Sequence, residues 1–170
     1  KLVWLRIETD AYDVPVYSQV MEQYGKFTDD NRSGRVVSAY ALDRHGIAAA
    51  VSKMAFGNGM GVKIEHNVDA RDLFAPAFGD IVAEVPADKV GELGITYTVI
   101  GEVTDDATLS YRDMSIGLCE AEAAWTEPLE KVFPTRSEAE GGPTAFFVAG
   151  KETEAGRLGE DGCFHATGVH

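Results

Sequence analysis

The chain has 170 residues, of which 45% are hydrophobic and 25% charged, so one compact domain with its own core is expected. Its 28 acidic and 15 basic residues give a net charge of −13, which argues against a surface that neutralises nucleic-acid phosphates. No stretch approaches the roughly 20 apolar residues of a membrane span, and the first residues lack a secretory leader pattern. The sequence therefore predicts a cytoplasmic protein with no nucleic-acid or membrane partner, and its cysteines, Cys119 and Cys163, are expected to be reduced.

The first part of the chain alternates strand and helix patterns. Leu2–Ile7 is typical of a buried strand, and a helix capped by Asp13 is expected to stop at Gly25. The polar residues 26–35 predict a surface loop, which leads to a strand at Val36–Tyr40. A second helix is expected from Gly46, with a glycine-rich turn after it.

The rest of the domain is predicted to be richer in strands. The expected elements, in chain order, are a strand at 61–64, a short helix at 69–74, a strand at 80–85, a helix at 87–93, a strand at 95–103, a segment at 109–114 that pairs back on it as a hairpin, and a helix from about Ser115 that Pro128 kinks or divides.

The helical pattern is lost from about Ser137. Residues 1–136 are therefore predicted to form the domain, and residues 137–170 a flexible linker or tail. The mixture of helices and strands predicts an α+β fold, a layered α/β domain with a mixed sheet.

Three stretches resemble the C-terminal domain of the aminoimidazole ribonucleotide synthetase superfamily, in particular the copies within phosphoribosylformylglycinamidine synthase. Residues 37–56 resemble the signature in which a His-Asp-x-Ser-Asp-Gly-Gly-Leu loop precedes an alanine-rich helix ending Glu-Met-Ala. Leu73-Phe74 with residues 79–85 resembles a Leu-Phe-x-Glu segment and its strand. Residues 100–103 match an Ile-Gly-x-Val strand, and 122–136 look like a closing helix. The resemblance covers roughly residues 36–136.

This resemblance implies a fragment of an ATP-dependent ligase of purine biosynthesis. The parent reaction would convert formylglycinamide ribonucleotide to the amidine with glutamine-derived ammonia, using ATP and Mg²⁺. The implied partners are an N-terminal synthetase domain and a glutaminase domain of the same polypeptide, and the fragment by itself is expected to be inactive.

The loop that begins the second helix departs from the family signature. Ala41 and Arg44 stand where the signature has its two aspartates, and His45 stands where it has its first glycine, so only Gly46 of the loop survives. Ala and Arg cannot replace carboxylate ligands in kind, so the chain is interpreted as a degenerate scaffold copy with no catalytic residues. The residues Asp43, Arg44, His45 and Gly46 precede a helix and are the candidate ligand-binding site, with an ordinary solvated turn as the alternative.

No metal site is predicted. His66, near Glu65 and Asp69, could act as a ligand or base but is more simply a surface histidine. The rival function is a stand-alone acidic protein-interaction module that recognises a basic partner.

Overall fold

The computed structural model describes residues 1–130, 132–134, 157–158 and 164–165. The chain divides into two compact units, Lys1–Leu118 and Cys119–His170. The boundary at residue 136 and the tail at 137–170 stay predictions, because most of that segment lies outside the described residues.

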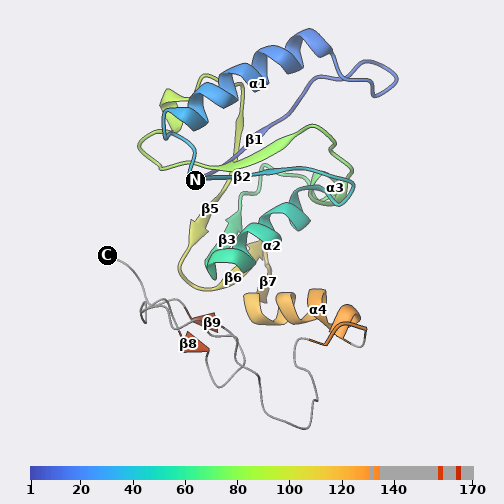
Figure 1. Cartoon of the computed structure of the whole chain (residues 1–170), viewed down its shortest axis with the longest axis vertical. Helices are drawn as coiled ribbons and strands as arrows, with labels where there is room; N and C mark the ends of the chain where they lie inside the picture. Colours follow the sequence, from blue (N-terminus) through green and yellow to red (C-terminus); the bar gives the residue numbers. More distant parts are fainter. Residues whose placement is uncertain (131, 135–156, 159–163, 166–170) are drawn as a thin grey trace, which may run out of the picture. The chain divides into compact units, whose positions relative to one another are not determined.

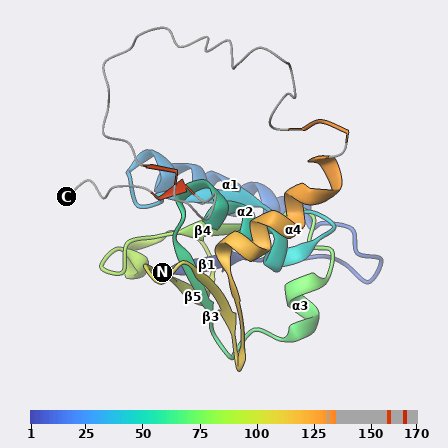
Figure 2. The same cartoon turned by 90° about the horizontal axis from the view of Figure 1, so that it is seen from below.

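The first unit is built on one seven-stranded sheet. Its strands are β1 (Leu2–Leu5), β2 (Ser38–Ala41), β3 (Gly61–Ile64), β4 (Ile81–Glu84), β5 (Thr98–Thr104), β6 (Thr108–Tyr111) and β7 (Met114–Gly117). The order across the sheet is β2-β4-β1-β5-β3-β6-β7, and all neighbours are antiparallel except β3 and β6, which are parallel. Strands β3 and β5 lie side by side in both views (Figure 1, Figure 2). The predicted α+β fold with a mixed sheet is confirmed.

Helices cover both faces of this sheet. The helix α1 (Tyr17–Arg32) lies on one face, and α2 (Gly46–Asn58) and α3 (Ala70–Phe74) lie on the other (Figure 1). Because side chains alternate along a strand, β1 contributes to both layers, and all four of its residues are buried. Leu2 and Trp4 belong to the larger core against α2, whereas Val3 belongs to the smaller core with Val36, Ala83 and Val85.

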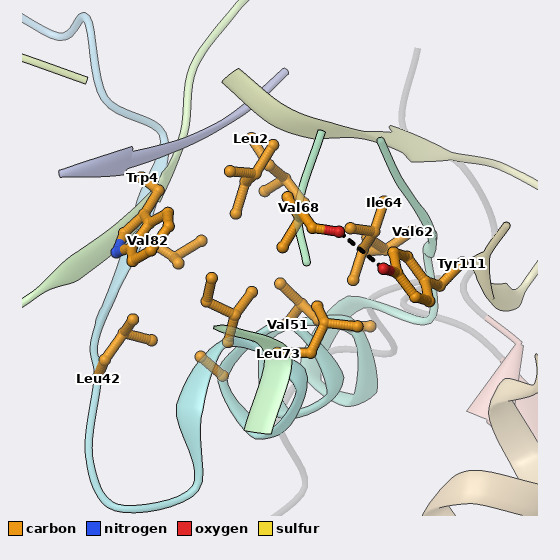
Figure 3. Close-up of a cluster of buried hydrophobic side chains, with 14 of the residues drawn as sticks. Leu2, Trp4, Leu42, Val51, Val62, Ile64, Val68, Leu73, Val82 and Tyr111 are labelled. Carbon is orange, nitrogen blue, oxygen red and sulfur yellow. Dashed lines mark hydrogen bonds between the residues drawn. The ribbon is translucent and has the colours of Figure 1, made fainter. Parts of the chain in front are cut away.

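The larger core is closed by an aromatic side chain at its β6 end. Figure 3 shows the Tyr111 hydroxyl pointing at the Val68 carbonyl, to which it donates a hydrogen bond of 2.7 Å. The ring packs with Val62, Ile64 and Leu73. This contact joins β6 to the segment between β3 and α3, and the two bonded residues, Tyr111 and Val68, are 43 positions apart in sequence.

The prediction of a surface loop at 26–35 is wrong for most of that segment, because α1 continues to Arg32. Phe27 packs against the smaller core, and the Asp30 side chain is buried. The Asp30 carboxylate accepts hydrogen bonds from Arg35 Nε at 2.9 Å and from the backbone N–H of Gly94. These tertiary contacts outweigh the weak helix propensity of Gly25.

Two further predictions are wrong. Residues 87–93 form only one 3₁₀ turn, η1 (Val90–Glu92), because Gly91 and Gly94 disfavour a longer helix. The segment after β5 does not pair back on it, because β3 already occupies that edge. Strand β6 pairs instead with the far side of β3, and β7 then pairs with β6.

The second unit begins with α4 (Leu118–Glu130), of which only Leu118 belongs to the first unit. Pro128 lies within α4, and the helix starts later than expected because residues 114–117 form β7. Two short strands, β8 (Arg157–Leu158) and β9 (Phe164–His165), pair antiparallel. Cys119 is disulfide-bonded, contrary to the expectation of reduced cysteines, and Cys163 lies outside the described residues. Within the described residues, no helix is long and apolar enough to cross a bilayer.

Candidate functional site

The four candidate residues lie together in the turn between β2 and α2. The preceding Leu42 is buried, and its backbone N–H donates to the Asp80 carbonyl at 2.8 Å. The backbone N–H of Ala77 donates to the Asp43 carbonyl at 3.1 Å. The turn is therefore anchored at its entry to the segment that leads into β4.

The carboxylate of Asp43 stabilises this turn. Its Oδ1 atom accepts a hydrogen bond of 2.7 Å from the backbone N–H of His45 and lies 3.1 Å from His45 Nδ1. The backbone N–H of His45 is the main cause that lowers the pKa of Asp43 below its ordinary value. The carboxylate that the sequence offered as a ligand thus serves as a local cap.

The hydrogen bonds around His45 select one tautomer of its ring. Arg44 Nε lies 3.2 Å from His45 Nε2, and a guanidinium can only donate. His45 Nε2 is therefore the acceptor, and the proton of the neutral ring resides on Nδ1, where it faces Asp43. The three side chains form a chain of hydrogen bonds at the surface, and His45 is half exposed.

Two side chains that the sequence analysis did not single out complete the cluster. Lys53 Nζ donates to the Tyr40 hydroxyl at 3.0 Å and lies 4.0 Å from Asp43 Oδ2. The hydrogen bond with Tyr40 is the main cause that raises the pKa of Lys53. Lys53 follows Gly46 by seven residues, two helical turns, so helical spacing could have placed it above the loop.

The glycine that survives from the family signature is required by packing. Gly46 has φ of +70°, and a Cβ added there would lie 2.6 Å from the Leu73 carbonyl oxygen and 2.7 Å from that of Ala75. The end of α3 therefore presses on the start of α2. These two carbonyl oxygens occupy the side of Gly46 where a Cβ would stand. Packing alone therefore explains why glycine is retained at this position, without any ligand.

The chemistry of the cluster does not fit Mg²⁺, which prefers several oxygen ligands in octahedral geometry. Asp43 is the only carboxylate of the loop and already caps the turn, while Arg44 and Lys53 bring positive charge. Among the described residues, no group of three or more His, Cys, Asp or Glu side chains could hold a metal ion. What the cluster offers is a small cationic surface beside the start of α2.

A separate apolar groove lies on the α2 side of the sheet. Its volume is about 230 Å³, and it lies between α2, α3 and the β6–β7 hairpin. The lining residues are Ala48, Val51, Ser52, Val62, Ile64, Leu73, Phe74, Leu109, Ser110, Tyr111, Met114, Ser115 and Ile116. Sequence reasoning missed it, because it depends on the parallel pairing of β6 with β3.

The sequence is similar to curated proteins named phosphoribosylformylglycinamidine synthase subunit PurL. The chain is 29% identical over 109 residues to phosphoribosylformylglycinamidine synthase subunit PurL of Corynebacterium aurimucosum, a match that covers 58% of this chain and 14% of that protein. It is 28% identical over 117 residues to the same subunit of Deinococcus radiodurans, covering 59% and 16%. The chain thus spans only a small part of the curated relatives it matches. No family model matches the sequence.

Solved structures show the same fold. Phosphoribosylformylglycinamidine synthase II of Thermotoga maritima superposes with a TM-score of 0.55 at 14% identity, over 69% of this chain and 24% of that chain. The T. maritima PurL complexed with ATP gives a TM-score of 0.54 at 14% identity, over 96% and 29%. The resemblance seen in the motifs is thereby confirmed: this chain is similar, in sequence over more than half its length and in fold, to a part of phosphoribosylformylglycinamidine synthase subunit PurL.

Proposed function

We propose that this chain is a segment of a PurL-like ligase of purine biosynthesis and that it serves there as a scaffold copy. The proposed whole enzyme is cytoplasmic and converts formylglycinamide ribonucleotide to the amidine, with ATP, Mg²⁺ and glutamine-derived ammonia. Its N-terminal synthetase and glutaminase domains would be the partners of this segment, with residues 1–136 as the domain and 137–170 as a linker. Support comes from the curated relatives and from T. maritima PurL structures complexed with ATP and with FGAR.

The observation that carries the scaffold role is the use made of Asp43. A catalytic loop of this family would present carboxylates toward metal-bound phosphates, whereas here the single loop carboxylate is held by His45. At position 44 the signature has an aspartate and this chain has an arginine, so the charge there is positive instead of negative. The loop retains a structural turn and has lost the ligands that would orient Mg²⁺.

Residues Asp43–Gly46 remain the proposed site of any ligand contact, and that contact would be weak. Arg44 and Lys53 would attract an anionic group such as a phosphate, and the dipole of α2 would add to their field. Both side chains are solvent-accessible, so the attraction is screened by salt. The loop is therefore proposed to assist nucleotide binding in the assembled enzyme without performing chemistry.

Calorimetric titration of the chain with ATP and Mg²⁺ tests this proposal. A dissociation constant of about 1 mM or weaker is expected, which corresponds to about −4 kcal/mol. Lys53→Met should weaken the residual binding, whereas Asp105→Asn, an exposed carboxylate in the β5–β6 turn, should leave it unchanged. Micromolar binding that Asp43→Asn abolishes, or turnover of ATP by the chain, would refute the scaffold role.

The proposal of a fragment has its own test in the gene. The reading frame should continue upstream into another α/β domain and downstream into a glutaminase with a cysteine nucleophile. A gene that encodes only this domain would favour the rival, a stand-alone acidic interaction module.

A further inference from the structure

The turn that leads into α1 and the first turns of that helix expose several large apolar side chains. Tyr12 is 87% exposed, Val14 45%, Tyr17 72% and Met21 71%. These four residues, called the entry patch below, lie within ten residues of sequence. Exposed aromatic and aliphatic side chains that gather in this way mark interaction surfaces more often than single exposed residues do.

The turn that presents Tyr12 is held in one conformation by its own hydrogen bonds. Asp10 Oδ1 accepts from the backbone N–H of Tyr12 at 2.8 Å and of Val14 at 3.0 Å. The backbone N–H of Asp10 donates to the Val14 carbonyl at 2.9 Å, and Thr9 forms a bridge with Pro15. Because the turn is ordered before any partner arrives, binding through it would cost little conformational entropy.

The helical half of the patch is ordered as well. Tyr17 and Met21 are four residues apart on α1 and therefore lie on the same face of the helix. Tyrosine offers a large contact area with few rotatable bonds, and its ring face attracts cations. The patch thus combines apolar contact area with two exposed aromatic rings.

The charges around the patch indicate what kind of partner it can bind. Glu8, Asp10, Asp13 and Glu22 are all exposed in the same segment. Lys26, the basic residue on the following turn of α1, pairs with Glu22 at 2.6 Å. A second copy of the chain is a poor occupant, because each copy carries a net charge of −13. A basic partner is attracted by the same field.

We infer that the entry patch docks a basic, apolar-containing segment of a protein partner. Apolar side chains of the partner rest on Val14 and Met21, while its Arg or Lys side chains pair with the surrounding carboxylates and stack on Tyr12 and Tyr17. The inference does not rest on the ligase proposal, because the patch lies on α1 and the turn before it, and α1 covers the opposite face of the sheet from α2 (Figure 1).

Fluorescence anisotropy on the full chain tests this docking site. The probe is a short dye-labelled peptide of alternating leucine and arginine, and a leucine–glutamate peptide is the control. The arginine peptide should bind and the glutamate peptide should not. The double variant Tyr12→Ser/Tyr17→Ser should weaken binding by about tenfold or more. Phe78→Ser, which removes a side chain that is 66% exposed elsewhere, should leave it unchanged.

Other outcomes overturn the inference. Equal binding to the double variant and to the native chain would mean that the negative charge attracts the peptide without the patch. Equal binding of both peptides would remove the role of the carboxylates. A dimer in sedimentation experiments that Tyr12→Ser dissociates would identify a second copy as the occupant. Circular dichroism of each variant checks that these exposed substitutions leave the fold intact.

Discussion

Substitution of Gly46 by alanine should destabilise the first unit strongly, for two separate reasons. The backbone has φ of +70°, a conformation that costs an L-residue about 1–2 kcal/mol. The new Cβ would also lie 2.6 Å and 2.7 Å from the carbonyl oxygens of Leu73 and Ala75, so α2 and α3 would have to separate. Together these costs should lower the free energy of unfolding by about 3–4 kcal/mol.

Gly59 provides a matched control for this experiment. It also has φ of +70°, but a Cβ added there would meet nothing within 4 Å. Urea unfolding followed by circular dichroism should therefore show a loss of only about 1–2 kcal/mol for Gly59→Ala, with an unchanged m-value for both variants. The difference between the variants measures the contact between α2 and α3. If both variants lose the same unfolding free energy, the contact between α2 and α3 is not the reason why position 46 requires glycine.

Two further substitutions test the buried carboxylates. Asp80 accepts from Trp4 Nε1 at 2.9 Å, so Asp80→Asn should cost about 1–3 kcal/mol. Burial raises the pKa of Asp80 in the folded chain above its ordinary value, which holds in the unfolded chain. Its contribution to stability is therefore complete below the ordinary carboxyl pKa and is lost as the pH rises through the raised pKa. In urea unfolding, the difference in unfolding free energy between the native chain and Asp80→Asn should be larger at acidic than at neutral pH. A difference that does not change with pH would contradict this. Removal of Arg35 leaves the buried Asp30 carboxylate without its cation, so thermal unfolding should reveal a loss of about 3 kcal/mol for Arg35→Ala. Lys26→Ala breaks an exposed pair with Glu22 and should leave the unfolding temperature almost unchanged. Similar losses for the Arg35 and Lys26 variants would argue against burial as the cause.

Elements set by local patterns could be predicted, and those set by distant contacts could not. The strand at Gly61–Ile64 and the helix that begins at Gly46 follow from residue type and spacing alone. The extension of α1 beyond Gly25 depends on Asp30, whose partner Gly94 is 64 residues away. The pairing of β6 likewise depends on which strand already occupies the edge of β5, information that no local pattern contains.

In the candidate site, too, the features set by local sequence could be predicted and those that depend on distant elements could not. The position of the Asp43–Gly46 turn before a helix was readable from the sequence, because glycine and polar residues separate two periodic segments. The hydrogen bond from Lys53 to Tyr40 required β2 and α2 to be placed side by side. The steric role of Gly46 required the position of α3, which a comparison of motifs cannot supply.

The central place of β1 in the sheet has a consequence for synthesis. Strand β1 is synthesised before the other strands of this sheet, yet it lies between β4 and β5, and the backbone nitrogen of Lys1 donates to the Val85 carbonyl, 84 residues later. At about 5–20 residues per second, β1 must wait about 4–17 seconds for its first neighbour. During that interval its apolar residues have no sheet to join. We therefore expect the nascent chain to expose the apolar residues of β1 during this interval, as a segment that chaperones can bind.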